Sequence, residues 1–390
     1  MKNSLLFKGI VFFGAIALFG QGCATFAPEP APQVEVPKED IVIGATLPLT
    51  GDLAEYGDSL RKALELSVNQ VNGKGGVNGR ALKLIVENDK CNPDLVANTM
   101  TKLIDLDKSS AIIGPACPDA ALTAAKLAEA KKVVIISPSV TDPTFTDSSD
   151  YTFRLVVSDA IRIKKLSETI YTENAENPSF GVIWENDIYN LALRTAFISF
   201  VADKRADVEV DIYFSTGTKD FKKEIEEIKN LPAIFISVNS EALTKILVEL
   251  EDRNYKGKIY VSTASLDDRD LIKTAAQNLA GVKFASFENY TGETYDDFAA
   301  AYKIAYNETP GIHAAETYDA VQILAKAMED KGFDAAGIVG GLYGIKNYNG
   351  ASGKITFDNN GDVSDRSFDY RVGHYDEEKE EVSFENLGSL

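Results

Sequence analysis

Residues 111–146 read AIIGPACPDAALTAAKLAEAKKVVIISPSVTDPTFT, and this stretch decides the fold of the chain. Two continuous apolar runs, residues 111–114 and 133–137, flank an alanine-rich segment that predicts a helix over residues 118–130. Continuous apolar runs are typical of strands in a parallel sheet that is covered on both faces. The stretch therefore predicts a strand–helix–strand unit whose strands both end in polar turns, where ligands collect in open α/β sheets.

The same alternation of strands and helices continues on both sides of this unit. Buried strands are expected at residues 41–47 and 82–87, and a second series of strands and helices runs from residue 158 to residue 276. Residues 350–372 instead alternate at period two around Gly and Asn turns, as antiparallel strands do. The pattern predicts two parallel sheets with helices on both sides, followed by an antiparallel end.

Length and charge narrow the class of protein. The chain has 390 residues, of which 45% are hydrophobic, and this is enough for two cores. Its formal net charge is −19, so nucleic acid is not an expected partner, because binding to phosphates needs clustered Lys and Arg.

The N-terminus predicts export. Lys2 and Lys8 precede an apolar run at residues 10–19, which is too short to span a bilayer and suits the core of a signal peptide over residues 1–22. Cys23 follows directly and resembles the lipidated residue of a lipoprotein, although Gly20 stands where that pattern has Leu; a plain signal peptide cut nearby is the alternative. The proline-rich residues 23–40 are expected to form a tether.

Two further cysteines, Cys91 and Cys117, follow predicted strands. Export favours a disulfide between them, because oxidising compartments preserve such bonds. A metal site is the poorer interpretation, since no third Cys or neighbouring His completes a tetrahedral set.

Several segments of the sequence are similar to those of one known family. GPACPDA and ISPSVTDPTFT, together with TGDLAEYGDS, NGKGGVNGR and LIVENDKCNPDLVANTMTKLI, resemble the periplasmic binding proteins for branched-chain amino acids, urea, amides and related solutes. The resemblance implies the type I fold of that family: α/β, with two Rossmann-like lobes of parallel sheets flanked by helices, joined by a three-strand hinge. It places residues 41–157 and 286–342 in lobe 1 and residues 158–285 and 343–390 in lobe 2, and it places a disulfide at Cys91 and Cys117.

The resemblance also implies where a ligand would bind. Tyr56 and Tyr189 would form walls on the two lobes, and Ser139 and Thr141 would give backbone and hydroxyl contacts. Turns at Asn239 and Ser265 would add polar contacts from lobe 2. Pro118 replaces the Ser that amino-acid-binding members have after the Cys, and Asp119 is the acidic residue we expect to pair with a ligand ammonium or amide N–H.

The sequence contains no motif that is typical of an enzyme active site. The two histidines, His313 and His374, lie in neither a nucleophile elbow nor a metal-ligand spacing, and no cofactor or metal site is predicted. We therefore expect an exported solute-binding lipoprotein of the cell envelope that binds a small amino acid or amide-like molecule by hinge closure and delivers it to an ABC permease. The alternative, which Pro118 favours, is an envelope lipoprotein of the same fold that has lost its ligand and regulates a protein partner.

Overall fold

The computed structural model describes residues 38–262, 266, 269–287, 290–364 and 366–390. Cys23, the predicted signal peptide, most of the tether and Ser265 lie outside the described residues. None of the helices in the described part is long and apolar enough to cross a membrane.

The first sheet is parallel, with the strand order β2-β1-β3-β4-β5. Its strands are β1 (Ile41–Leu47), β2 (Leu82–Asn88), β3 (Ala111–Ile113), β4 (Val134–Ser137) and β5 (Thr152–Arg154). The helices that connect or cover these strands are α1 (Ala54–Gly73), α2 (Pro93–Thr101) with a π-helical turn (Lys102–Leu106), α3 (Pro118–Lys131), α4 (Thr144–Asp147), α10 (Glu293–Tyr306), α11 (Ala314–Lys331) and α12 (Ala335–Gly344).

The strand–helix–strand unit predicted from residues 111–146 is confirmed. Strands β3 and β4 pair in parallel, with Ala111 beside Val134, and α3 connects them. Pro118 is the first residue of α3, a position where its missing N–H costs no hydrogen bond.

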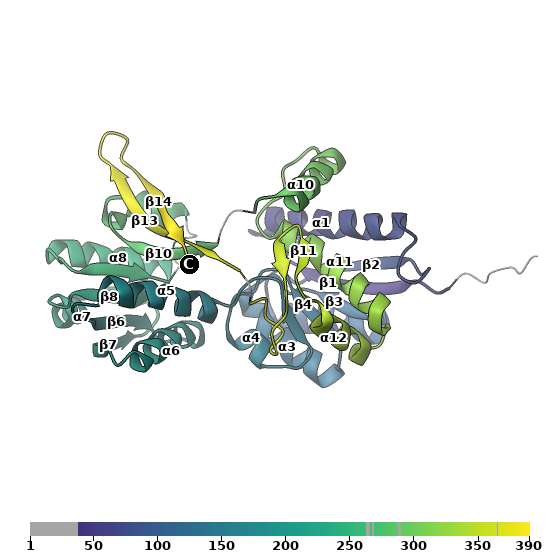
Figure 1. The fold of residues 1–390 in the computed structure, drawn as a ribbon, viewed down its shortest axis with the longest axis horizontal. Coiled ribbons are helices and arrows are strands. Elements are labelled where there is room, and N and C mark those ends of the chain that lie inside the picture. Colours follow the sequence, from purple (N-terminus) through teal and green to yellow (C-terminus); the bar gives the residue numbers. More distant parts are fainter. Residues whose placement is uncertain (1–37, 263–265, 267–268, 288–289, 365) are drawn as a thin grey trace, which may run out of the picture. The chain divides into compact units, whose positions relative to one another are not determined.

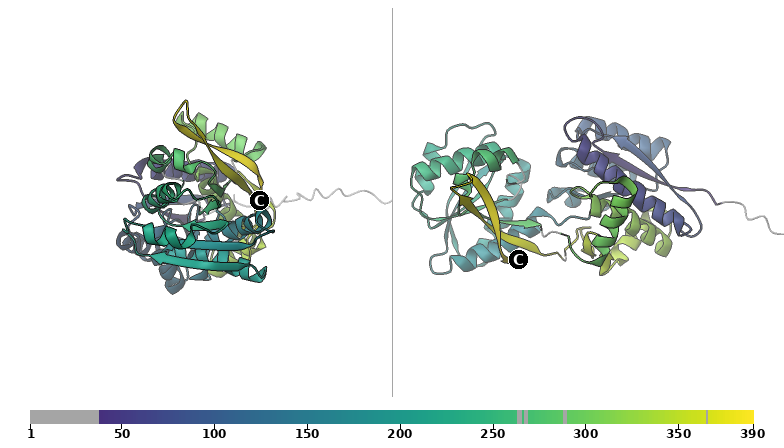
Figure 2. Two further views of the ribbon diagram at one scale, coloured as in Figure 1. Left: turned by 90° about the vertical axis from the view of Figure 1, so that its left-hand side faces the viewer. Right: turned by 90° about the horizontal axis from the view of Figure 1, so that it is seen from above.

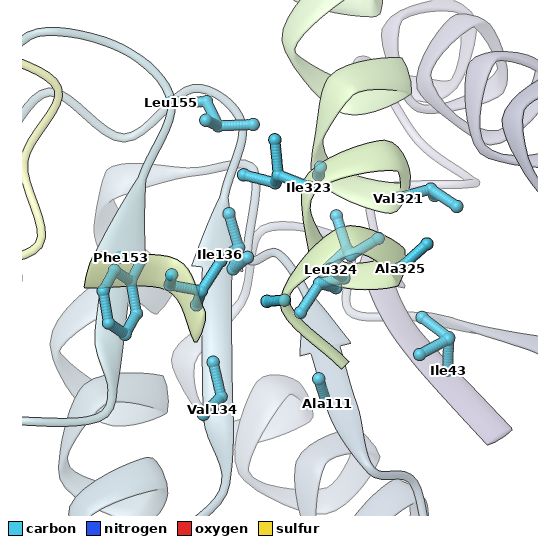
Figure 3. Packing of buried hydrophobic residues seen from close by; sticks show 14 of the residues in the cluster. Ile43, Ala111, Val134, Ile136, Phe153, Leu155, Val321, Ile323, Leu324 and Ala325 are labelled. Carbon is cyan, nitrogen blue, oxygen red and sulfur yellow. The ribbon is translucent and has the colours of Figure 1, made fainter. Parts of the chain in front are cut away.

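The core of the first sheet includes a helix from far along the chain. Figure 3 shows Val321 and Leu324 of α11 beside Ile43, Ala111 and other side chains of the sheet. Apolar residues of α11 recur at helical spacing, so one stripe of the helix is buried against the strands. Figure 1 shows α11 and α12, in green, lying against the strands of this sheet.

The second sheet has the order β14-β13-β10-β9-β8-β6-β7. Strands β6 (Ser179–Glu185), β7 (Asp207–Phe214), β8 (Ala233–Ser237), β9 (Lys258–Val261) and β10 (Lys283–Phe287) are parallel, and β13 (Phe368–Asp376) and β14 (Glu381–Ser389) add an antiparallel hairpin. Figure 2 shows this hairpin, in yellow, at the edge of the teal sheet. The accompanying helices are α5 (Asp159–Glu173), α6 (Ile188–Asp203), α7 (Lys222–Ile228), α8 (Ser240–Asp252), α9 (Arg269–Thr274) and a 3₁₀ turn (Gln277–Leu279).

The predicted fold class is confirmed, since two mainly parallel sheets are each flanked by helices. The chain passes from one sheet to the other three times: between β5 and α5, between β10 and α10, and between residues 363 and 368.

One predicted boundary differs from the structure. The resemblance places residues 343–390 in the second lobe, but Ile345, Ile355, Phe357 and Val363 pack in the core of the first sheet. The short hairpin β11 (Tyr348–Gly350) and β12 (Gly353–Ile355) belongs to this segment, and only β13 and β14 join the second sheet. Period-two alternation marks strands, but it does not say which sheet they accompany.

The structure contains the disulfide Cys91–Cys117, which joins the turn after β2 to the residue before α3. The two Cα atoms are 5.4 Å apart, and the bond closes a loop over a sequence separation of 26. Closing a loop of this length restricts the unfolded chain and so favours the folded state.

We expect the double variant Cys91→Ser/Cys117→Ser to unfold with a free energy lower than that of the wild type by about 3 kcal/mol, the loop-closure value. Urea denaturation followed by circular dichroism measures the difference. The wild type under reducing conditions is the control and should match the variant. Equal midpoints for the oxidised wild type and the variant would contradict the expected contribution.

Candidate functional site

The polar turn that follows β4 is held by a buried cation. Arg154, the last residue of β5, is fully buried and donates to the carbonyl oxygens of Val140 at 3.2 Å and Asp142 at 2.7 Å. It also donates to Thr146 Oγ1 at 2.6 Å and to Asp362 Oδ1 at 2.5 Å. Burial raises the pKa of Asp362, and the nearby Arg154 charge opposes that rise. One guanidinium thus fixes the backbone of the turn in which Ser139 and Thr141 lie.

Ser139 joins this turn to the turn after β3. Its hydroxyl donates to the Ala116 carbonyl at 2.9 Å and pairs with the phenol of Tyr56, whose pKa is raised by burial. The Tyr56 ring meets the His313 ring edge-on at a centroid distance of 6.5 Å. The structure therefore brings Tyr56 and Ser139 together, but the single hydroxyl proton of Ser139 is already used within the protein.

Thr141 and Tyr189 meet through Asp159. The Thr141 carbonyl accepts from the Asp159 N–H at 2.9 Å, and the Tyr189 hydroxyl donates to the Asp159 carboxylate. Asp159 also forms an ion pair with Arg162 one turn along α5. Burial and the Asp159 charge raise the pKa of Tyr189, so its phenol remains a neutral donor. A turn of the first sheet is in this way linked to helix α6 of the second.

Asn239 and Asp119 are not part of this group. Asn239 is the N-cap of α8, where its side-chain oxygen accepts from the Ala242 N–H and its amide nitrogen donates to Glu185 at 2.9 Å. These contacts occupy both ends of its amide. Asp119 is exposed in the first turn of α3, a position that favours an acidic side chain for electrostatic reasons.

A cavity that the sequence did not reveal lies where the three connections between the sheets meet. We call it the hinge pocket; it has a volume of about 240 Å³, and its walls include Val157, Phe287, Tyr290, Glu316, Lys354 and Arg366. Each connection contributes to the pocket, and Glu316 comes from the first turn of α11. The pocket is apolar where Val157 and Phe287 line it and polar around Glu316 and Arg366.

The charged groups of the pocket are shielded from solvent. The side chain of Glu316 is 1% exposed and accepts a hydrogen bond from the Tyr290 hydroxyl. Burial raises the pKa of Glu316 to about 8, against the opposing effect of the Arg366 charge. Burial also lowers the pKa of His313 to about 4, so this imidazole is neutral at pH 7. At that pH the Glu316 carboxyl is mostly protonated.

Arg366 anchors the third connection. Its guanidinium donates to the carbonyl and hydroxyl oxygens of Ser352 and to the Leu155 carbonyl at 3.4 Å. The sequence gives no signal for these roles, because Glu316 reads as an ordinary acid in the first turn of a helix and Arg366 follows a turn. Within the described ranges, no cluster of three His, Cys, Asp or Glu residues could hold a metal ion.

The chain belongs to the periplasmic binding protein family, whose sequence profile matches residues 40–376. A relative from Pseudomonas aeruginosa, the leucine-, isoleucine-, valine-, threonine- and alanine-binding protein, is 23% identical over 351 residues, which are 88% of this chain and 92% of the relative.

Two solved structures share the fold over nearly their whole length. A leucine-binding protein from Thermotoga maritima has a TM-score of 0.70 and 24% identity and covers 90% of this chain and 98% of its own. A branched-chain amino acid transporter substrate-binding protein from Streptococcus pneumoniae, in complex with isoleucine, has a TM-score of 0.67 and 23% identity and covers 89% and 99%. This likeness confirms the type I periplasmic binding protein fold.

Replacing Arg154 by Met should lower the free energy of unfolding by about 3–5 kcal/mol, because Asp362 would remain buried without its cation. The matched control is Arg61→Met in α1, whose ion pairs lie at a partly exposed surface and contribute about 0–1 kcal/mol. Urea denaturation of both variants measures the difference. An equal decrease in the free energy of unfolding for the two variants would show that the buried Arg154 contributes no more to stability than a surface arginine.

Proposed function

We propose that this protein is an extracytoplasmic solute-binding lipoprotein of an ABC importer, which binds a small amino acid or amide-like ligand between its two sheets and closes on it by a hinge. The observation that carries the proposal is the polar turn at the carboxyl end of β4, which lies against the elements of the second sheet through Asp159 and Tyr189. Membership of the periplasmic binding protein family over residues 40–376 supports the same function.

The proposed mechanism follows from how the polar groups are held. Tyr56 and Tyr189 would act as aromatic walls, and Thr141 would contribute its hydroxyl from a turn that Arg154 keeps rigid. Groups fixed before the ligand arrives lose little conformational entropy on binding. A ligand that touches elements of both sheets stabilises the arrangement in which they are close together, which is the thermodynamic basis of hinge closure.

We expect at least one of L-leucine, L-isoleucine, L-valine, acetamide and urea to raise the melting temperature, because a ligand that binds only the folded state stabilises it, by about 2.7 kcal/mol at one hundred times Kd. Thr141→Val should reduce the rise, whereas Thr172→Val, an exposed hydroxyl that bonds only within α5, should not. Solution scattering with the binding solute should show a smaller radius of gyration.

A panel that leaves the melting temperature of the wild type unchanged would contradict the proposal. That result would favour the alternative function, in which a lipoprotein of this fold binds a protein partner. An unchanged radius of gyration with a solute bound would contradict hinge closure alone.

We also propose that Cys23 carries a lipid that holds the protein at the outer face of a membrane. The full-length protein expressed in bacteria should then partition into the detergent phase, and Cys23→Ser should move it to the aqueous phase without changing its melting temperature. Mass spectrometry of the N-terminal peptide identifies the modification. A wild-type protein that starts beyond Cys23 and stays in the aqueous phase would show that the signal peptide is a plain one.

A further inference from the structure

The Cys91–Cys117 disulfide adjoins the backbone that supports the polar turn after β4. Cys117 directly follows Ala116, whose carbonyl oxygen accepts a hydrogen bond from the Ser139 hydroxyl at 2.9 Å. The preceding carbonyl oxygen, that of Pro115, accepts a second hydroxyl from the end of β4 at 2.8 Å. The position of Cys117 therefore bears directly on the two acceptors against which the turn is held.

The other half of the bond is anchored to the ends of β1 and β2. The Cys91 N–H donates to Asp89 Oδ1 at 2.9 Å, and Thr46 Oγ1 donates to Asp89 Oδ2 at 2.9 Å. Asp89 is fully buried, so these bonds lie in an environment of low dielectric, where they are strong. Through the disulfide, the turn after β3 is fixed to this buried carboxylate as well as to its own strand.

Cys91 is held in an unfavourable backbone conformation. Its φ is 57° and that of Lys90 is 51°, so two consecutive residues with side chains lie in the left-handed region. Such conformations persist where the surrounding structure enforces them. The disulfide is one of the bonds that hold Cys91 there, so its cleavage would allow the turn after β2 to relax.

The position of Cys117 favours its release from the disulfide as a thiolate. It is the N-cap of α3, and its side chain makes no capping hydrogen bond among the described residues. The N-terminus of a helix stabilises a thiolate, and a stabilised leaving thiolate speeds thiol–disulfide exchange. Cys91 is half-buried whereas Cys117 is buried, so the Cys91 sulfur is the more accessible to an external thiolate.

We propose that Cys91 and Cys117 are redox-sensitive positioning residues, and that reduction of their disulfide by a dithiol loosens the turn after β4 and weakens solute binding. A thiolate of the dithiol attacks Cys91 Sγ, the S–S bond breaks, and Cys117 leaves as a thiolate that takes up a proton. The second thiol of the reductant then displaces Cys91. The dithiol is oxidised to a disulfide, and its two electrons and two protons convert the protein disulfide to two thiols. The effect on binding rests on the proposed function.

Hydrogen exchange measured by mass spectrometry tests the loosening without any solute. Dithiothreitol should reduce the disulfide in the folded wild-type protein, and peptides that contain residues 137–143 should then exchange faster. Peptides from β8 and α8 of the second sheet should not change. Alkylation before digestion identifies free thiols at Cys91 and Cys117, and reoxidation should restore slow exchange. Circular dichroism and the melting temperature establish that the reduced protein is folded.

The variant Ser139→Ala tests the route from the disulfide to the turn. It lacks the hydroxyl that bonds to Ala116, so its oxidised form should already exchange fast in residues 137–143, and reduction should add little. The matched control is Thr172→Val, which removes an exposed hydroxyl that bonds only within α5 and should respond to reduction as the wild type does. A disulfide that only raises overall stability would affect both variants equally.

Calorimetric titration with L-leucine, or with acetamide if only amides stabilise the protein, tests the effect on binding. The reduced wild type and the double variant Cys91→Ser/Cys117→Ser should both bind at least about fivefold more weakly than the oxidised wild type, the lower end of typical coupling between two sites. Reoxidation should restore the affinity of the wild type. Dithiothreitol should not alter binding by the double variant, because that protein has no disulfide to reduce.

A disulfide that dithiothreitol cannot reduce in the folded protein would overturn the proposal, and so would unchanged exchange in residues 137–143 after reduction. Equal responses of Ser139→Ala and Thr172→Val would show that the bond acts through overall stability and not through the turn. Equal affinities of the oxidised and reduced wild type would overturn the effect on binding.

Failure of this inference is distinguishable from failure of the proposed function. If the oxidised wild type binds no solute of the panel, the proposed function fails, and the exchange experiment still decides whether the disulfide positions the turn. If the oxidised wild type binds a solute and reduction changes neither exchange nor affinity, solute binding stands and this inference fails.

Discussion

The fully buried guanidinium of Arg154 is the interaction on which the candidate site depends. It stands at the end of β5 and bonds the carbonyl oxygens of the turn after β4, and it reaches Asp362 on the segment that leads into the third connection. A buried cation is costly unless each of its donors is paired, so the turn and Asp362 are held where the guanidinium needs them. The hydrogen bonds that offset the cost of burying this cation also fix the backbone around Thr141. They join the first connection to the third.

The second constraint is that three connections meet at one place. Arg366 on the third connection donates to Leu155 on the first and to Ser352 beside β12, while Tyr290 on the second donates to Glu316. These bonds are the kind that must shift when the sheets move relative to each other, because they join segments on different connections. In the proposed hinge closure, a ligand that brings the two sheets together would therefore also shift these bonds.

The sequence predicted the fold well because the strands, helix starts and turns of this fold follow from patterns among neighbouring residues. Continuous apolar strands, the Pro118 helix start and the turns after β3 and β4 can all be read from neighbouring residues. The family resemblance named Tyr56, Ser139, Thr141 and Tyr189 as ligand residues. The contact between Tyr56 and Ser139 and the link from Thr141 to Tyr189 through Asp159 come from the structure, since no periodicity predicts contacts over such separations. The position of residues 345–363 was missed for the same reason: alternation predicts strands but not the sheet that they accompany.

The hinge pocket could not be predicted because its character comes from burial. Glu316 and Arg366 are common residues in ordinary sequence contexts, and only the folded chain shows that both line one cavity and that Oε2 and Nε are buried without a hydrogen-bond partner among the described residues. The most direct test is a crystal structure of the wild-type protein grown with saturating L-leucine. The account predicts leucine in contact with elements of both sheets, including the Thr141 turn and the ring of Tyr189. Leucine bound to elements of one sheet only, or at a site remote from the Thr141 turn, would contradict it.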